Sequence, residues 1–250
     1  MNSFQRFERE IQHAEVILNR GEEVWNWSSP AGQMRWRRRC GLFTSFIVGR
    51  HRTILEIGCG TGLFTQCLAS LDCELFSIDI SKNLLEQARK RVPASNVTFK
   101  VDNVCRSDLK SACFDYVVGS SILHHLEVKS ALREIFRLLK PGGKCLFTEP
   151  NMMNPQIALQ KNIPFLKKWA GDSPDETAFF RWGLSKKFKN QGFINVRVEP
   201  FDFLHPAIPQ YLLPALNPMA SILETVPVIK EIAGSLIISA EKPCSNEQAS

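Results

Sequence analysis

Short apolar runs and segments of helical periodicity alternate over the middle of the chain. Apolar runs of strand length, bounded by turn residues, occupy residues 53–58, 74–79, 97–101, 116–119 and 144–148. Between them, apolar residues recur at helical spacing over residues 63–71, 81–92 and 128–139. Ser81 is a good N-cap for the second of these helices, and Pro141 with the two glycines after it ends the third. Strands that alternate with helices predict an α/β fold with a parallel sheet covered on both faces.

The last part of the chain departs from this alternation. Residues 193–203 and 235–240 are expected to form two further strands, and the segment from Phe203 to Leu223 contains no charged residue. An uncharged run of about 20 residues has the length of a membrane span, but the prolines here would leave backbone groups unpaired in lipid. We therefore expect a helical lid, a dimer contact or an interfacial surface.

Composition indicates an ordinary globular protein. The 250 residues are 44% hydrophobic and 22% charged, which argues against disordered, collagen-like and coiled-coil classes. The formal net charge of +6 is small for a dedicated nucleic-acid binder. Between Arg35 and Arg52, however, six arginines form a basic stretch that contains no acidic residue.

Cysteine spacing and the first residues favour a reducing compartment. None of the eight cysteines stands in a CxxC or other metal-ligand spacing, so no metal site is expected. The N-terminal sequence carries charges of both signs and lacks the apolar core of a secretory signal. These features predict a cytoplasmic protein with reduced cysteines.

A glycine-rich loop, residues 58–62, separates the first expected strand from its helix. Small residues at this place let a ligand approach the backbone amides. Asp79 ends the second strand 21 residues after Gly58, where a carboxylate can accept hydrogen bonds from ribose hydroxyls. The loop and the acid together indicate a nucleoside-containing ligand at the carboxyl ends of parallel strands. The nicotinamide pattern G-x-G-x-x-G is not met, because the third glycine, Gly62, comes one position early.

The set of motifs resembles the class I S-adenosylmethionine-dependent methyltransferases. The resemblance runs from about Thr53 to Asn151, and its other motifs are residues 77–79, 114–118 and 138–143. It implies a Rossmann-like, seven-stranded, mostly parallel sheet with helices on both faces. The last strand would be antiparallel and inserted beside the sixth.

The resemblance also implies how one domain is organised along the chain. Residues 1–52 would form an N-terminal helical cap and residues 53–150 the cofactor-binding core. Residues 151–250 would form a substrate-side half, in which the apolar insertion 203–232 precedes the last strand. The helical cap and the insertion would cover the substrate.

Cofactor contacts follow from the same resemblance, for S-adenosyl-L-methionine and its product S-adenosyl-L-homocysteine. The implied cofactor-binding residues are Glu56, Gly58, Cys59, Gly60, Thr61, Gly62, Asp79, Ile80, Asp102, Asn103 and Ser120. Among them, Asp79 would hold the ribose, and Asp102 and Asn103 would lie at the adenine. The plain alternatives are a tight turn for the glycines and a helix-capping or solvated carboxylate for Asp79.

Two histidines follow the fourth strand, at the edge where the methyl group would be presented. A sulfonium already activates its methyl group, so the protein mainly has to align an acceptor and exclude water. A hydroxyl or protonated amine acceptor also needs a base, and His124 and His125 are the candidates, of which we favour His125. The pair could instead pack or cap its own turn. Glu149, after the fifth strand, is expected either in the same crevice, on the substrate side, or paired with an arginine.

The flanks of the core are expected to select the acceptor. Trp25 and Trp27 lie ahead of the glycine loop, and we assign Trp27 to the substrate side. Arg35, Arg38 and Arg39 share one face of an expected helix. This face is either solvated or attracts a phosphate, a carboxylate or an anionic lipid headgroup.

Three functions compete at this point. We favour a methyltransferase for a small-molecule or amphiphilic, lipid-like acceptor, with peripheral membrane contact as an option and no nucleic-acid partner. The fourth-strand motif, Gly-Ser-Ser-Ile-Leu-His-His, supports it because many enzymes for nucleic-acid or protein amides and amines have Asn-Pro-Pro-aromatic there. A protein or RNA methyltransferase is second, and a nicotinamide oxidoreductase or non-catalytic nucleoside-binding module is third. The methylated atom and the oligomeric state stay open.

Overall fold

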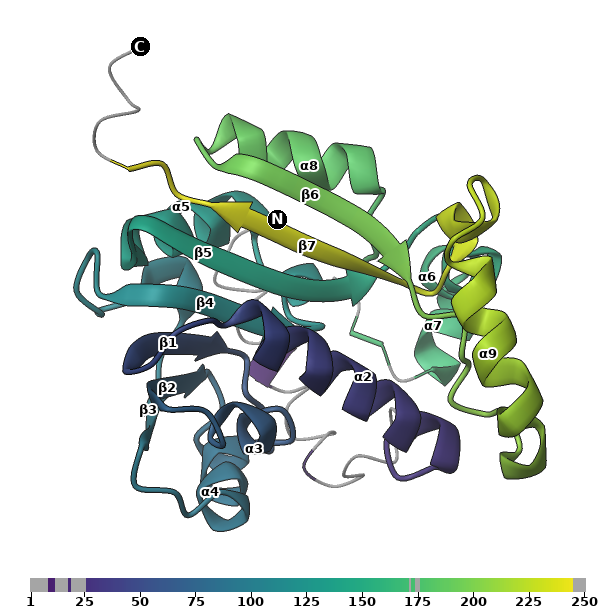
Figure 1. The fold of residues 1–250 in the computed structure, drawn as a ribbon, viewed down its shortest axis with the longest axis horizontal. Helices are drawn as coiled ribbons and strands as arrows, with labels where there is room; N and C mark the ends of the chain where they lie inside the picture. Colours follow the sequence, from purple (N-terminus) through teal and green to yellow (C-terminus); the bar gives the residue numbers. More distant parts are fainter. Residues whose placement is uncertain (1–8, 12–17, 19–25, 171, 174–175, 245–250) are drawn as a thin grey trace.

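A seven-stranded sheet forms the centre of the protein in the computed structural model (Figure 1). The structure describes residues 9–11, 18, 26–170, 172–173 and 176–244. The strands are β1 (Arg52–Ile57), β2 (Cys73–Asp79), β3 (Val97–Val101), β4 (Phe114–Ser120), β5 (Leu139–Pro150), β6 (Ile194–Phe201) and β7 (Ser235–Glu241).

The strand order is β3-β2-β1-β4-β5-β7-β6. Strands β1 to β5 pair in parallel, whereas β7 pairs antiparallel with both β5 and β6. The expected α/β fold, with an antiparallel last strand inserted beside the sixth, is therefore confirmed. The order reverses between β1 and β4, and such a switch point in an open α/β sheet is where ligands bind.

Helices connect and cover the strands. The α-helices that the structure describes are α2 (Pro30–Phe46), α3 (Thr65–Leu68), α4 (Lys82–Arg91), α5 (Val128–Leu138), α6 (Pro155–Asn162), α7 (Pro164–Trp169), α8 (Arg181–Asn190) and α9 (Leu213–Leu223). Short 3-10 helices are η2 (Val104–Arg106), η3 (Leu123–His125), η4 (Gln210–Leu212) and η5 (Ile229–Ile232). The expected cap is present, because the Ser81 hydroxyl accepts a hydrogen bond from the backbone N–H of Leu84 at 3.3 Å.

Alternating side chains of the strands build two cores, one on each face of the sheet. Leu55 and Val117 face one side, where α5 and α8 pack on them. Ile54 and Val118 face the other side and meet Phe43 of α2, which crosses this face in Figure 1. A strand buried on both faces has to be apolar at nearly every position, which is why the first and fourth strands are continuous hydrophobic runs.

Two element boundaries differ from the expectation. Helical structure after the glycine loop is limited to α3, because Leu63 and Phe64 turn toward the cavity described below. Strand β5 starts at Leu139, where a helix end was expected, and continues through the Pro-Gly-Gly sequence. It does so because Leu139 pairs with Phe114 and the Gly142 N–H donates to Lys242 O at 2.9 Å.

The uncharged segment after β6 packs back onto the N-terminal side of the sheet. Leu204, Leu213 and Ala220 form a small core with Ala31 of α2. Among the residues that the structure describes, none of the helices combines the length and the hydrophobicity that a membrane span requires. Through this small core the segment packs against α2.

The arginines of α2 hold this segment and do not form a solvated face. The Arg39 side chain is 3% exposed, and Nη1 lies 2.7 Å from Asp202 Oδ2. Arg35 Nε bonds the same carboxylate oxygen at 2.9 Å, and the Arg38 guanidinium pairs with Glu224. The expectation of a solvated face was wrong because its acidic partners lie more than 160 positions away in the sequence.

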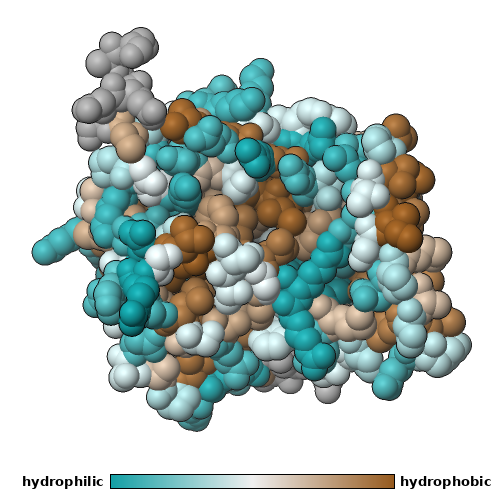
Figure 2. Space-filling view, in the orientation of Figure 1, coloured by the Kyte–Doolittle hydropathy of each residue, from teal (hydrophilic) through white to brown (hydrophobic). Residues whose placement is uncertain are grey.

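Hydrophobic side chains are nevertheless exposed on the outer side of the late segment. Figure 2 shows them gathered at the end of the molecule where α9 and η5 lie. The exposed residues there include Tyr211, Met219, Ile222, Val228, Ile229 and Ile232. Val228 is 81% exposed and has a left-handed φ of 69°, an unusual conformation for a β-branched residue.

Candidate functional site

A cavity of about 200 Å³ opens at the carboxyl ends of β1, β2 and β4. It lies at the switch point of the strand order. Sequence-predicted residues that line it are Trp27, Gly58, Cys59, Gly60, Thr61, Asp79, Ile80, Asp102, Ser120, His124 and His125. Glu56, Gly62, Asn103 and Glu149 are not among its lining residues. Trp25 lies outside the described residues.

The glycine loop approaches the cavity with its backbone. Gly58, Gly60 and Gly62 all have positive φ, of 66°, 53° and 80°. A Cβ on Gly58 would lie 2.4 Å from Ile122 Cδ1, whereas a Cβ on Gly60 would have nothing within 4 Å. Gly58 is therefore required by packing within the protein, and Gly60 leaves an open space beside the cavity that a ligand can use.

Asp79 ties the end of β2 to this loop. Its Oδ2 accepts a hydrogen bond from the Gly60 N–H at 2.9 Å, and its Oδ1 accepts one from the Ser81 N–H at 2.9 Å. Burial raises the pKa of Asp79, while these two N–H groups favour the ionised form. Each carboxylate oxygen has a second lone pair, so the residue can also accept from a ligand hydroxyl.

Asp102 and Asn103, which follow β3, have different surroundings. Asp102 lines the cavity, and its Oδ2 bonds Lys100 Nζ at 3.1 Å and Ser107 Oγ at 3.0 Å. The Asn103 side chain accepts from the Cys105 N–H at 3.0 Å and so caps η2. The structure places only the aspartate at the cavity wall.

Glu56 lies behind the glycine loop and is 3% exposed. Its Oε2 accepts hydrogen bonds from Thr65 Oγ1 at 2.7 Å and from Ser77 Oγ at 2.8 Å. Burial raises the pKa of Glu56 to about 7, against the effect of these two hydroxyls. The residue thus joins β1, β2 and the start of α3, and it supports the loop from behind.

Smaller side chains complete the wall. Ser120 Oγ lies 2.9 Å from Thr148 Oγ1, and Thr61 Oγ1 accepts from Arg91 Nη1 at 2.9 Å. Burial raises the pKa of the Cys59 thiol well above its ordinary value, which makes it a small apolar wall residue.

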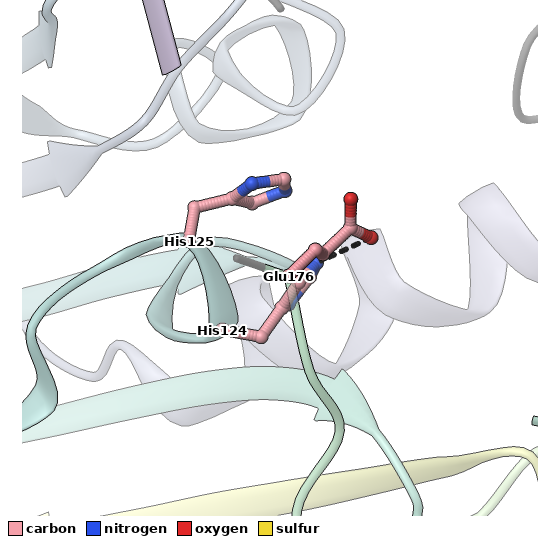
Figure 3. Close-up of side chains that lie close together, drawn as sticks. All are labelled: His124, His125 and Glu176. Atoms are coloured by element: carbon pink, nitrogen blue, oxygen red, sulfur yellow. Dashed lines mark ion pairs between the residues drawn. The ribbon is translucent and has the colours of Figure 1, made fainter. Parts of the chain in front are cut away.

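His124 is enclosed by two carboxylates, of which Figure 3 shows that of Glu176. Its Nδ1 lies 2.6 Å from Glu149 Oε2, and its Nε2 lies 3.4 Å from Glu176 Oε1. Burial alone would lower the pKa of this imidazole, but the two carboxylates outweigh burial and raise it to about 9. His124 therefore holds its proton at neutral pH and is not suited to accept another.

Glu149 has a second function at the same turn. Its Oε1 accepts hydrogen bonds from the backbone N–H groups of Ile122 at 2.9 Å and Leu123 at 2.7 Å. A buried carboxylate at the start of η3 thus fixes the turn that carries both histidines. Neither alternative expected for Glu149 is found: it does not line the cavity, and its partners are His124 and these amides and not an arginine.

His125 has another environment, on the cavity wall. Its Nδ1 lies 2.8 Å from Glu10 Oε2, and its ring is tilted by 38° against that of His124, with centroids 4.2 Å apart. His125 is 17% exposed, against 5% for the His124 side chain. Of the two histidines that line the cavity, His125 is the more exposed.

His124, His125 and Glu176 bring their ligand atoms within 4.8 Å of one another. Glu176 Oε1, however, also pairs with Lys161 Nζ at 2.5 Å. A protonated imidazole offers no lone pair to a cation, and an ammonium group repels one. The arrangement is an ion-pair network around a positively charged His124.

Two acids at the site could not be found from the sequence. Glu10 and Glu176 lie in segments without a motif, and no residue spacing links them to His124 or His125. A carboxylate beside each histidine could have been expected only from the general need of a buried imidazolium for a counter-charge.

Comparisons with known proteins identify the family. Residues 55–147 match the family described as a methyltransferase domain. These residues belong to the class I S-adenosylmethionine-dependent methyltransferases. The sequence resemblance is thereby confirmed, and S-adenosylmethionine is the cofactor of the domain.

Two sequence relatives each match part of this chain. A methyltransferase-like protein of Schizosaccharomyces pombe is 27% identical over 175 residues, 70% of this chain and 64% of that protein. The demethylmenaquinone methyltransferase of Symbiobacterium thermophilum is 32% identical over 136 residues, 51% of this chain and 53% of that enzyme. This chain thus spans between half and two thirds of the length of these two relatives.

A solved structure shows the same fold. Phosphoethanolamine N-methyltransferase 2 of Haemonchus contortus, in complex with phosphomonomethylethanolamine and S-adenosylhomocysteine, superposes with a TM-score of 0.68 at 21% identity. The superposition covers 97% of this chain and 61% of that chain. The likeness of fold therefore extends beyond residues 55–147 to nearly the whole chain.

The cavity of this methyltransferase domain fits the cofactor by its chemistry. Gly60 leaves room at the loop, and the carboxylates of Asp79 and Asp102 offer acceptors for hydroxyl and amino groups. Ile80 and Leu84 supply apolar wall for an adenine ring.

Proposed function

We propose that the protein transfers the methyl group of S-adenosylmethionine to a small-molecule or amphiphilic acceptor, and that His125 accepts the proton that the acceptor loses. The observation that carries the proposal is the place of His125. It lines the same cavity as the glycine loop and Asp79, and it is not enclosed as His124 is.

Different residues of the chain have different roles in the proposed reaction. Asp79 and Asp102 bind and orient the cofactor beside the glycine loop, and the cofactor supplies a methyl group on a sulfonium when bound. Glu149 fixes the turn after β4 through the amides of Ile122 and Leu123. His125 then takes the acceptor proton at the cavity wall.

Relatives support a small-molecule acceptor. The demethylmenaquinone methyltransferase of Symbiobacterium thermophilum is named for such an acceptor and is 32% identical over 136 residues. Three arginines of the stretch that would support an RNA or acidic protein substrate are already paired, since Arg35 and Arg39 bond Asp202 and Arg38 bonds Glu224. Helix α2 therefore offers little basic surface to a macromolecular acceptor.

Exposed apolar residues support the amphiphilic version of the proposal. Met219, Ile222 and Val228 project from the outer side of the late segment. Such a patch favours contact with a lipid surface or an apolar substrate. Co-sedimentation with neutral liposomes tests this part: Val228→Asp with Ile222→Asp should lower binding, and equal binding by the double variant would contradict it.

One labelling experiment tests the proposed reaction. The purified protein is incubated with methyl-labelled S-adenosylmethionine and a cell extract, which is then divided into small-molecule, lipid, protein and nucleic-acid fractions. We expect label in the small-molecule or lipid fraction, lost with His125→Asn and kept with His51→Asn, an exposed histidine control. Label confined to protein or nucleic acid would overturn the proposal.

A further inference from the structure

The hairpin of α6 and α7 is a helical element without a core of its own. None of the eight residues of α6, all of which the structure describes, is buried. Apolar side chains of the hairpin are instead open to the outside: Leu159 is 56% exposed, Ile163 40% and Phe165 74%. A helix of a globular protein normally buries its apolar stripe against other elements. This hairpin therefore presents an apolar surface that no other described element covers.

Ion pairs hold the hairpin on its inner side. Lys161 Nζ lies 2.9 Å from Asp172 Oδ2 and also pairs with Glu176 Oε1. The turn between these two acids is closed by the Ser173 N–H, which donates to Glu176 Oε2 at 2.9 Å. Glu176 in turn faces His124, as Figure 3 shows. The hairpin is thus joined by charged groups to the histidine turn of the cavity wall.

Further exposed apolar residues lie beside the hairpin. Asn154, which precedes α6, donates from Nδ2 to Ile232 O at 2.8 Å, so η5 lies next to the start of the hairpin. Ile229 and Ile232 of η5 are themselves exposed. Of the fourteen large hydrophobic residues that are exposed in the described part of the chain, twelve lie between Leu159 and Ile232. Such an accumulation marks a contact surface.

The exposed charges of this part of the chain all have the same sign. From residue 151 to residue 244, every exposed charged side chain that the structure describes is basic, and these are Lys168, Lys186, Lys187, Lys189 and Arg197. The acids next to the hairpin, Asp172 and Glu176, are turned toward Lys161. Exposed acids such as Glu74 and Glu86 belong to the first part of the chain. A partner of the hairpin therefore has to be partly apolar and negatively charged.

An anionic phospholipid bilayer has both properties. Its headgroups attract lysine side chains, and its boundary region accepts apolar ones. A second copy of this chain would bring exposed lysines against exposed lysines, and like charges repel one another. A nucleic acid matches the charge, but its bases stack on aromatic side chains and offer little to the aliphatic Leu159 and Ile163.

We infer that the α6–α7 hairpin docks the protein on an anionic lipid bilayer, with its exposed apolar side chains among the headgroups and Lys168 at the lipid phosphates. The inference deepens the proposed function and rests on it for the amphiphilic acceptor. Because Lys161 joins the hairpin to Glu176, the docked side of the protein is the side that carries the histidine turn.

Co-sedimentation with two kinds of vesicle tests the inference. One kind is phosphatidylcholine alone, and the other is an equimolar mixture of phosphatidylcholine and phosphatidylglycerol. The wild-type protein should bind the mixed vesicles more tightly, and added salt should weaken this binding. Phe165→Ser should weaken it roughly tenfold or more, because a phenylalanine side chain is no longer buried in the lipid. Lys168→Gln should weaken it about fivefold, the effect of one cation near an anionic surface.

Matched controls separate docking from folding and from surface charge in general. Val48→Ser removes an apolar side chain that is 58% exposed after α2, and Lys90→Gln removes an exposed lysine of α4. Both should bind the mixed vesicles as the wild type does. The melting temperatures of Phe165→Ser and Lys168→Gln should also equal that of the wild type, because both side chains are exposed.

Three results would overturn the inference. The first is equal binding of the wild-type protein to the two kinds of vesicle, and the second is wild-type binding by Phe165→Ser. The third is another occupant: a dimer in sedimentation equilibrium that Phe165→Ser dissociates, or binding of a single-stranded RNA that Phe165→Ser abolishes.

Failure of the docking inference differs from failure of the proposed function. If the protein binds neither kind of vesicle but transfers label to small molecules, docking is wrong and the proposed reaction stands. If the protein binds mixed vesicles through the hairpin but transfers label only to protein or nucleic acid, docking stands and the proposed function is lost.

Discussion

The backbone N–H of Gly60 donates a 2.9 Å hydrogen bond to Asp79 Oδ2, so the loop after β1 and the end of β2 are joined before any ligand is considered. This bond orients the carboxylate toward the cavity and keeps the loop in its left-handed conformation. Asp79 therefore both holds the loop and faces the cavity, and a substitution of Asp79 should affect these two roles to different degrees.

Asp79→Asn should weaken cofactor binding more than folding. The amide keeps one oxygen acceptor, so it can satisfy only one of the N–H groups of Gly60 and Ser81, a loss of about 1 kcal/mol in the free energy of unfolding. Loss of a charged acceptor for the ribose should raise the dissociation constant of S-adenosylmethionine roughly tenfold to a hundredfold. Calorimetric titration measures it, with exposed Asp108→Asn as control. Unchanged affinity would remove Asp79 from the cofactor site.

The glycines of the loop should respond differently to the same added methyl group. Gly58→Ala forces a Cβ to within 2.4 Å of Ile122 Cδ1 and should lower the melting temperature strongly. Gly60→Ala meets no protein atom within 4 Å, so its cost to folding is about 1 to 2 kcal/mol from the positive φ alone. It should nevertheless abolish most cofactor binding.

Gly41→Ala is the matched control for this pair. Gly41 lies within α2, and a Cβ there would have nothing within 4 Å. Alanine should stabilise this helix by up to about 1 kcal/mol and leave cofactor affinity unchanged. Normal cofactor affinity in Gly60→Ala would show that the ligand does not occupy the space beside that residue.

Local signals were sufficient to predict which strand-end residues line the cavity. The glycine loop, Asp79 and Asp102 each follow a strand end, and parallel topology brings strand ends to one edge of the sheet. The partners of the histidines and of the α2 arginines could not be predicted in this way. Glu10, Ser173 and the partners of the α2 arginines come from segments that only the folded chain brings together.

The histidine pair shows the same limit of prediction from the sequence even more clearly. His124 and His125 are adjacent and were both candidates for the base, with His125 favoured, and η3 turns them to different surroundings. The choice between them depends on Glu149, Glu176 and Glu10, whose positions depend on β5 and on loops that no motif marks.

The buried pair of Arg39 and Asp202 should be essential for holding the late segment. Asp202→Asn keeps a residue that tolerates its φ of 75° but leaves the Arg39 guanidinium without a counter-charge. Breaking such a buried pair costs on the order of 3 kcal/mol, which urea denaturation should detect. Asp72→Asn breaks an exposed pair with Arg50 and should have no measurable effect. Equal stability of the two variants would mean that Arg39 finds another acid.

The charge on His124 should make the protein less stable in alkaline solution. The pKa of this histidine is raised from 6.5 to about 9 in the folded protein, so folding favours its protonated form. The stabilisation is complete below pH 6.5 and is lost as the pH rises through about 9, on the order of 3 kcal/mol in all. Urea denaturation at a series of pH values measures this dependence of the free energy of unfolding on pH.

His124→Gln should be less stable than the wild type at pH 6 and should flatten the slope of stability against pH, because Glu149 and Glu176 then face a residue that does not titrate. His51→Gln, at an exposed position, should keep the wild-type slope. A wild-type slope in His124→Gln would assign the pH dependence to another group and remove the argument that His124 is unable to serve as the base.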